Sequence, residues 1–219
     1  MLLAGSGVYD GSEITEAVSL LVGLSRLQAE VKCFAPNTNQ AHVVDHTTGE
    51  EDPIPRNTLK ESARIARGAV TPIEELRASD FDALFVPGGF GAAKNLSDFG
   101  FKGAEMQVYP STQSVLEDFK REKKVIALSC IAPILAAKAF GNCEITLGKE
   151  TGENWPYAGS SGAAKSFGAR HKECEIHEVC VDPVNRIVTV PAYMKGDAKP
   201  HEVADSMELL VQTVSKMIK

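Results

Sequence analysis

Apolar runs alternate with segments of helical period along most of the chain, which is typical of a parallel sheet covered by helices. The runs 82–87 and 124–130 are almost continuously apolar, as expected for strands buried on both faces. Further strands are expected at 30–35, 144–147, 175–181 and 186–190. Helices are expected at 13–27, 59–65, 114–122, 131–140, 160–167 and 201–218. This order predicts a mostly parallel, doubly wound α/β fold, with sites at the carboxyl ends of the strands.

The remaining segments refine this picture. Residues 37–56 are rich in polar residues and are expected to form an irregular or hairpin excursion. Ser12 is the expected N-cap of the first helix. The apolar stretch 1–4 runs directly into a glycine turn and resembles the end of a first strand, so we expect that residues have been removed before it. Because no linker interrupts the sequence, residues 1–219 are predicted to form a single domain.

Composition excludes several classes of function. The 219 residues are 43% hydrophobic and 24% charged, which is ordinary for a globular protein. The formal net charge is −6, and Lys and Arg are scattered, so nucleic-acid binding is not expected. No apolar run reaches the ~18–20 residues of a membrane-spanning helix, so we expect no membrane partner.

Neither a disulfide framework nor a metal site is expected. The five cysteines are odd in number and form no CxxC pair, which favours a reducing intracellular compartment. His42 and His46 are four residues apart but lack a third ligand nearby, so they predict no metal. The sequence also contains no Walker or dinucleotide-binding fingerprint, and no cofactor is expected.

Cys130 is the main candidate for chemistry. It lies between an expected strand and an expected helix, which is the outline of a nucleophile elbow. A sharp turn would expose its sulfur, and the following helix N-terminus would favour thiolate over thiol. The alternative is a small hydrophobic residue that caps a buried strand, as most free cysteines do. The spacing alone leaves both interpretations open.

Two further groups are expected beside this cysteine. Gly88 and Gly89 follow a buried strand, where their N–H groups can point inward, although a tight turn without a ligand is an alternative. With the N–H of Ile131, the glycine turn could hold an oxyanion. Glu13 and Glu16 are three residues apart at a helix start, so both carboxylates can face one cleft. Acidic residues are also common in a first helical turn without any further role.

Several longer motifs carry a resemblance to a known family. They are SGVYDGSEI, CFAP, VVDHTTGE, ESARIARG, VPGGFGAAKNLSDF, CIAP and VTVPAYM, in this order. With these motifs the chain resembles the ElbB-like family, within the ThiJ/PfpI branch of class I glutamine amidotransferase-like proteins. The stretch WPYAG is more similar to the eukaryotic, mitochondrial members than to the bacterial ones.

The resemblance implies a flavodoxin-like three-layer α/β sandwich and a homodimer. It implies that Cys130 is the nucleophile and that Glu16, with Glu13 as a nearby alternative, contacts it. Gly89 and Ile131 match the oxyanion position. The resemblance also implies a mitochondrial location for a eukaryotic protein, with the cytoplasm as the alternative.

The chain departs from the family pattern in ways that restrict its activity. Ile131 follows the nucleophile where peptidases of this branch carry a histidine, and no downstream His-x-Glu completes an amidotransferase triad. Lys149 lies where eukaryotic relatives tend to have a histidine, and Ser6 replaces a cysteine that is common in the first glycine turn. Proton transfer would therefore fall to Glu16 or water.

These observations predict a cofactor-independent, glyoxalase-like enzyme. Its substrate would be a small aldehyde such as glyoxal or methylglyoxal, and its product a hydroxy acid. Its rate enhancement is expected to be modest, because a single positioned acid or base contributes ~10²–10⁴-fold. The alternative is a non-catalytic redox-sensing or binding protein that uses an oxidisable Cys130.

Overall fold

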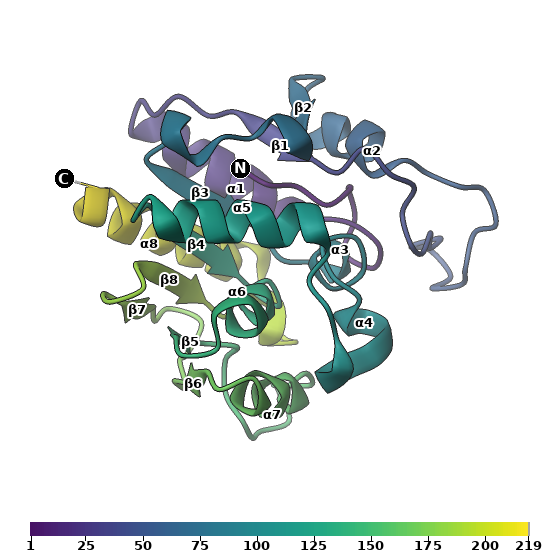
Figure 1. Ribbon diagram of the computed structural model, residues 1–219. Helices are drawn as coiled ribbons and strands as arrows, with labels where there is room; N and C mark the ends of the chain where they lie inside the picture. The colour runs from purple at the N-terminus through teal and green to yellow at the C-terminus, as the bar shows by residue number, and fades with distance from the viewer. Residues whose placement is uncertain (219) are drawn as a thin grey trace.

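The computed structural model describes residues 1–218, and helices cover both faces of its central sheet (Figure 1). The α-helices are α1 (Ile14–Arg26), α2 (Thr58–Ile65), α3 (Phe90–Lys94), α4 (Phe99–Lys102), α5 (Pro110–Arg121), α6 (Pro133–Phe140), α7 (Gly159–Ser166) and α8 (Pro200–Ile218). The strands are β1 (Cys33–Ala35), β2 (Val70–Pro72), β3 (Ala83–Val86), β4 (Val125–Ser129), β5 (Glu144–Ile145), β6 (Arg170–His171), β7 (Cys180–Asp182) and β8 (Ile187–Val190).

The sheet has the order β3-β4-β8-β7, in which only β7 runs antiparallel to its neighbour. The N-terminal segment extends this sheet beyond β3. Leu2 N–H donates to the Phe85 carbonyl at 2.8 Å, and Leu3 N–H donates to the Phe34 carbonyl at 2.8 Å. Leu2 and Leu3 therefore lie between β3 and β1, as expected for the end of a strand, and β1 pairs in parallel with β2. Strands β5 and β6 form a separate parallel pair.

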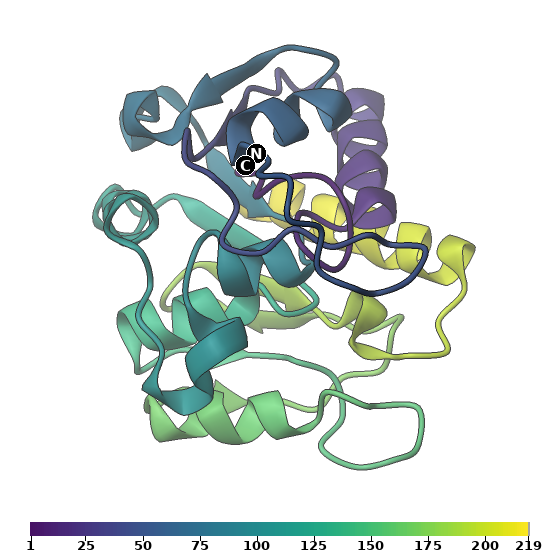
Figure 2. The same cartoon turned by 90° about the vertical axis from the view of Figure 1, so that its right-hand side faces the viewer.

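The helices form two layers around the sheet. α1 packs against α8, which in turn covers β4 and β8, and Figure 2 shows these two helices side by side in purple and yellow. α5 packs against β4 and α6 and lies on the opposite face (Figure 1). This arrangement confirms the predicted doubly wound, three-layer fold. Within residues 1–218, no helix has both the length and the apolar character to cross a bilayer.

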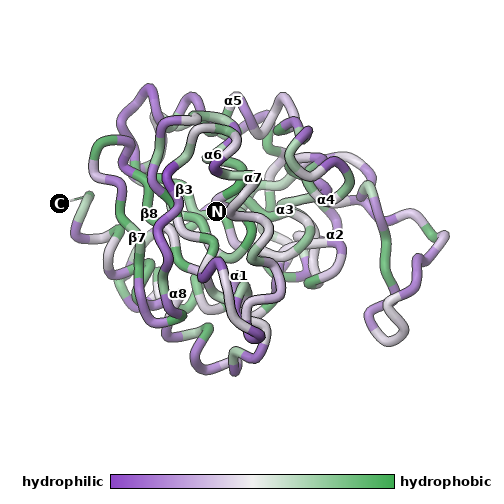
Figure 3. The backbone as a smooth tube through the Cα atoms, turned by 90° about the horizontal axis from the view of Figure 1, so that it is seen from below, coloured by the Kyte–Doolittle hydropathy of each residue, from purple (hydrophilic) through white to green (hydrophobic). Residues whose placement is uncertain are grey.

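β4 lies at the centre of the core. All five of its residues are buried, because α5 covers one face and α8 the other. Large side chains from both layers are fully buried against the sheet, such as Leu20 of α1 and Phe119 of α5. In Figure 3 the segments in the interior of the molecule are largely hydrophobic, and those at its outline are largely hydrophilic. The continuous apolar runs were thus a sound basis for predicting β3 and β4.

The expected helices and strands are present, but some are shorter than predicted. Residues 175–178 form a turn, so the strand predicted at 175–181 is limited to β7. The strand predicted at 144–147 ends at Ile145 because the next two N–H groups bond to side chains, Thr146 to Thr189 Oγ1 and Leu147 to His171 Nε2. α3, α4, β2 and β6 were not predicted from the sequence.

The start of α1 also differs from the prediction. Glu13 is the N-cap, and its carboxylate accepts a hydrogen bond from Glu16 N–H at 2.7 Å. Ser12, the predicted cap, instead accepts a bond from Ala4 N–H through its hydroxyl, at 2.9 Å. Its hydroxyl thus ties the glycine turn back to the N-terminal segment.

The predicted excursion at 37–56 is confirmed, and it projects from the body of the molecule (Figure 1). A bridge between Val44 and Glu51 makes part of it a hairpin. The excursion is tied to the first glycine turn, because Asp10 Oδ2 accepts a bond from Val44 N–H and His46 Nε2 accepts one from Tyr9 N–H.

Candidate active site

Cys130 lies at a sharp turn at the carboxyl end of the central strand. β4 ends at Ser129 and α6 begins at Pro133, so three residues reverse the chain. Cys130 has a φ of 58°, in the left-handed region that non-glycine residues seldom adopt. Its N–H still pairs with the Val190 carbonyl of β8 at 3.0 Å, which holds the strained residue in place. The sharp strand-to-helix turn predicted at Cys130 is therefore present.

Glu16 reaches this elbow from α1 and is completely buried. Its Oε2 accepts two hydrogen bonds, from Ser129 Oγ at 2.6 Å and from Gly88 N–H at 2.8 Å. Its Oε1 has no hydrogen-bond partner among the described residues. Because both donors act on Oε2, a proton on this carboxyl group would reside on Oε1.

Gly88 lies against both the thiol and the carboxyl group. A Cβ atom at this position would overlap Cys130 Cβ and would lie 2.9 Å from both Cys130 Sγ and Glu16 Oε2. The close approach of these two functional groups therefore requires glycine here. The Gly88 carbonyl also accepts a bond from Glu13 N–H at 2.9 Å, which fixes the start of α1 to the glycine turn.

The thiol and the carboxyl group hold at least one proton between them near neutral pH. Burial, with repulsion from Glu13, raises the pKa of Glu16 to about 7, although its hydrogen bonds oppose this. Burial and repulsion from Glu16 also raise the pKa of Cys130 well above its usual value. Two adjacent negative charges are thus disfavoured in this dry environment. The expectation that the helix N-terminus lowers the thiol pKa is wrong, because burial outweighs the helix.

The predicted oxyanion donors are only partly available. The N–H groups of Gly89 and Ile131 act on the Cys130 sulfur and oppose the rise of its pKa. The N–H of Gly88 is already bonded to Glu16 and to Ser129 Oγ, so this residue positions the acid instead of contacting a ligand. Five of the six predicted residues meet around the elbow. Glu13, the sixth, caps α1 and lines the adjoining pocket.

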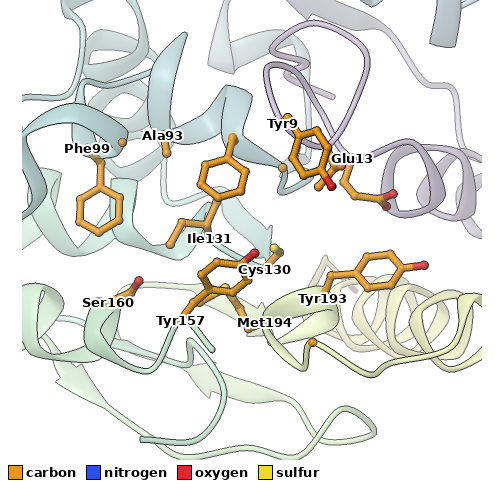
Figure 4. Close-up of a pocket in the computed structure, with 15 residues that line it drawn as sticks. Tyr9, Glu13, Ala93, Phe99, Cys130, Ile131, Tyr157, Ser160, Tyr193 and Met194 are labelled. Carbon is orange, nitrogen blue, oxygen red and sulfur yellow. The ribbon is translucent and has the colours of Figure 1, made fainter. Parts of the chain in front are cut away.

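A pocket of about 540 Å³ opens above Cys130 (Figure 4). Its volume is typical of sites for small organic molecules. Its wall is largely apolar and aromatic, and it includes no Lys, Arg or His among the described residues. The lining residues are Val8, Tyr9, Glu13, Gly89, Phe90, Ala93, Phe99, Gly100, Cys130, Ile131, Tyr157, Ser160, Tyr193, Met194 and Gly196.

Sequence reasoning missed Ser129 and the aromatic wall. Ser129 is the one polar residue in an otherwise apolar buried strand, and a buried hydroxyl needs a partner, so its role could have been suspected. Tyr157 belongs to the WPYAG stretch, and the structure places this tyrosine in the pocket wall. Lys149 does not line the pocket and pairs with Glu175 at 3.2 Å.

The fold defines a class of proteins. The doubly wound sheet with helices on both faces corresponds to the amidotransferase-like DJ-1/ThiJ/PfpI fold, a flavodoxin-like α/β fold. The chain superposes on Drosophila melanogaster DJ-1beta with a TM-score of 0.52 at 18% identity, covering 98% of this chain and 94% of that one. At this identity the likeness concerns the fold alone.

Three nearer matches define the family. The chain is 47% identical over 220 residues to a Rattus norvegicus protein named ES1 protein homolog, mitochondrial. It is equally similar to the human glutamine amidotransferase-like class 1 domain-containing protein 3, mitochondrial, and each match covers 99% of this chain and 82% of the relative. An Ehrlichia chaffeensis structure, titled isoprenoid biosynthesis protein with amidotransferase-like domain, matches with a TM-score of 0.88 at 35% identity, covering 98% of this chain and 97% of that one.

The chain therefore belongs to the family of ES1 proteins, also named glutamine amidotransferase-like class 1 domain-containing proteins. A scan against protein-family models found no match.

Proposed function

We propose that the protein is a cofactor-independent, glyoxalase-like enzyme that converts small α-oxoaldehydes to hydroxy acids through Cys130. The observation that carries this proposal is the buried carboxyl group beside the elbow. Glu16 lies next to the thiol, has one oxygen without a partner and has a pKa near 7. A group that is close to half-protonated at neutral pH can both accept and donate a proton during turnover.

The first step forms a carbon–sulfur bond. The Glu16 carboxylate accepts the thiol proton, and the Cys130 sulfur adds to the aldehyde carbon. The carbonyl electron pair moves to the oxygen, which the N–H groups of Gly89 and Ile131 stabilise. This oxygen then takes the proton from Glu16, so that a neutral hemithioacetal forms and the carboxylate is restored.

The second step is an internal oxidation and reduction. Glu16 removes the hydrogen of the former aldehyde carbon as a proton, and the electron pair moves toward the neighbouring carbonyl, whose oxygen takes the negative charge of an enediolate. The neighbouring carbon then gains a proton from Glu16, and the remaining hydroxyl proton moves to the adjacent oxygen. The former aldehyde carbon is oxidised to a thioester and its neighbour is reduced to an alcohol, so no external electron acceptor is required.

The last step consumes one water molecule. Water attacks the thioester carbon, the same two N–H groups stabilise the oxyanion, and the sulfur leaves with a proton as the thiol. Glyoxal yields glycolate and methylglyoxal yields lactate. No histidine lines the described pocket, so we assign these transfers to the Glu16 carboxyl group beside the thiol, with Glu13 in the pocket wall, or water, as the alternative. One carboxyl group with several tasks supports a modest rate.

The test is Cys130→Ser with a discontinuous assay of lactate formed from methylglyoxal. Cys143→Ser is the matched control, because Cys143 is also free and buried but does not line the pocket. We expect loss of at least ~10³-fold in the Cys130 variant, since the nucleophile itself is weakened, and no change in the control. Full activity in Cys130→Ser would falsify the proposal.

The alternative role, redox sensing by Cys130, is less well supported. A sensor cysteine is accessible and readily ionised, whereas burial keeps this thiol protonated. The proposal is in keeping with the resemblance to ElbB-like proteins. The names of the rat and human relatives support a mitochondrial location if the source of the chain is eukaryotic.

A further inference from the structure

We infer that the pocket selects uncharged α-oxoaldehydes that carry an aromatic or similarly bulky apolar group, in preference to methylglyoxal. The inference rests on the proposed function and specifies its substrate class. It is carried by the size of the pocket, by its aromatic walls and by the charges that line it.

The pocket is much larger than a small oxoaldehyde requires. Its volume is about 540 Å³, and Cys130 lies in its wall beside Gly89 and Ile131. With its aldehyde carbon at the sulfur, methylglyoxal would place a single methyl group in the remaining space. A ring in the same place would bury far more apolar surface, and the pocket would bind it more strongly.

Aromatic side chains surround this space. Tyr9 and Tyr157 lie in loops and Tyr193 in a short 3-10 helix (Ala192–Met194), and all three line the same pocket as Cys130 (Figure 4). Phe90 packs edge-on against Tyr157, with 6.0 Å between the ring centroids. Rings arranged in this way offer both faces and edges to a flat apolar guest.

The wall that carries Tyr157 is held in position from behind. The Asn154 carbonyl accepts a hydrogen bond from Gly196 N–H at 2.8 Å. The Trp155 ring packs so closely on Gly148 that a side chain at Gly148 would overlap it. The loop that carries Tyr157 is thus held by the contacts of Asn154 and Trp155, which favours a preformed pocket.

The charges at the pocket exclude anionic substrates. The described lining contains no Lys, Arg or His, and Glu13 is its one carboxyl group. Lys94 lies 5.1 Å from the centre of the Phe90 ring, but its Nζ is engaged by the Tyr9 carbonyl and His42 Nδ1, each at 2.8 Å. A carboxylate or phosphate in the pocket would lose its water without gaining a counter-charge.

Three aldehydes test the inference: methylglyoxal, phenylglyoxal and 4-carboxyphenylglyoxal. We expect kcat/KM for phenylglyoxal to exceed that for methylglyoxal by at least ~10-fold. The added carboxylate should reduce kcat/KM at least ~10-fold relative to phenylglyoxal, since its size is similar but its charge is unpaired. Cys130→Ser serves as the blank, because it corrects for reaction of these aldehydes with arginine side chains.

Two variants separate binding from the intrinsic reactivity of the aldehydes. Tyr157→Ala should remove most of the preference for phenylglyoxal, whereas Tyr109→Ala, outside the pocket, should retain it. The unreactive ketones acetophenone, acetone and 4-acetylbenzoate provide a binding measurement by calorimetry that needs no turnover. Acetophenone should bind at least ~10-fold more tightly than either of the others.

The outcomes are distinguishable. Cys130-dependent turnover with equal kcat/KM for the three aldehydes would overturn the substrate inference and leave the proposed function in place. A preference for phenylglyoxal that Tyr157→Ala leaves unchanged would also overturn it, because the preference would then reflect reactivity. No turnover of any aldehyde would overturn the proposed function and this inference with it.

Discussion

The two sides of the pocket are built in different ways. At the thiol, short hydrogen bonds link α1, the turn after β3 and the end of β4, and Glu16 Oε2 receives two donors. On the aromatic side, Tyr9 and Tyr157 come from loops and Tyr193 from a short 3-10 helix, and all three line the pocket. Hydrogen bonds among buried groups depend on direction and tolerate little change in the side chains that form them. Apolar packing tolerates other groups of similar shape and volume. The difference suggests that the first side determines the reaction and the second the substrate.

Glu16→Gln tests the thiol side of the pocket and should have the largest effect on the reaction. The amide keeps the shape and can still accept bonds from Ser129 and Gly88, but it cannot shuttle protons. We expect kcat to fall by ~10²–10⁴-fold, the contribution of a positioned acid or base. Lactate formation under saturating methylglyoxal measures it. A loss below ~3-fold would assign the proton transfers to water.

The same variant should change how stability depends on pH. The pKa of Glu16 is raised from 4.5 to about 7 on folding, so the folded chain binds more protons than the unfolded chain in this interval. This contribution to stability is complete below about pH 4.5 and is lost as the pH rises through about 7. Glu16→Gln should remove this decline, which is on the order of 3 kcal/mol. Urea unfolding at a series of pH values checks this, and parallel curves for the two proteins would contradict it.

Ser129→Ala should produce a smaller effect on the same side. The serine hydroxyl lowers the pKa of Glu16, so its removal should raise that pKa further. Because the thiol proton is transferred to the carboxylate, the rise of activity with pH should move to higher pH. We expect activity at pH 7 to fall about tenfold and stability by about 1 kcal/mol. An unchanged pH profile would show that Ser129 has no part in tuning the acid.

Tyr157→Phe tests the aromatic side of the pocket and should have the smallest effect. It retains the ring that packs against Phe90 and removes only the hydroxyl group. Activity with phenylglyoxal should change by less than ~3-fold, because the ring supplies the contact surface. A loss as large as that of Ser129→Ala would show that the hydroxyl bonds to the substrate, and that the two sides are not separate.

The parts that could be predicted are those that adjacent residues determine. A run such as 124–130 is apolar because both of its faces are covered, and an abrupt junction after it places Cys130 on a turn. The N-cap was misassigned because serine is the better cap in general, but the Ser12 hydroxyl is already engaged by Ala4 N–H.

Other features depend on contacts between distant segments. The pairing of Ser129 with Glu16 joins residues that are 113 positions apart, and no local pattern indicates it. Similarly, the loop that carries Tyr157 is tied to Gly196 by the hydrogen bond to the Asn154 carbonyl, and no local pattern indicates this contact. The thiol pKa was misjudged because burial depends on the whole fold.

The long sequence separation between Glu16 and Ser129 has a consequence for folding. Contacts between residues so far apart in the sequence form only after the intervening chain has closed into a loop. The site should therefore be among the last features to assemble. Until then the glutamate is exposed to solvent and ionises like any other. In a refolding experiment, recovery of activity would thus report completion of the native state, and would lag behind the burst of secondary structure.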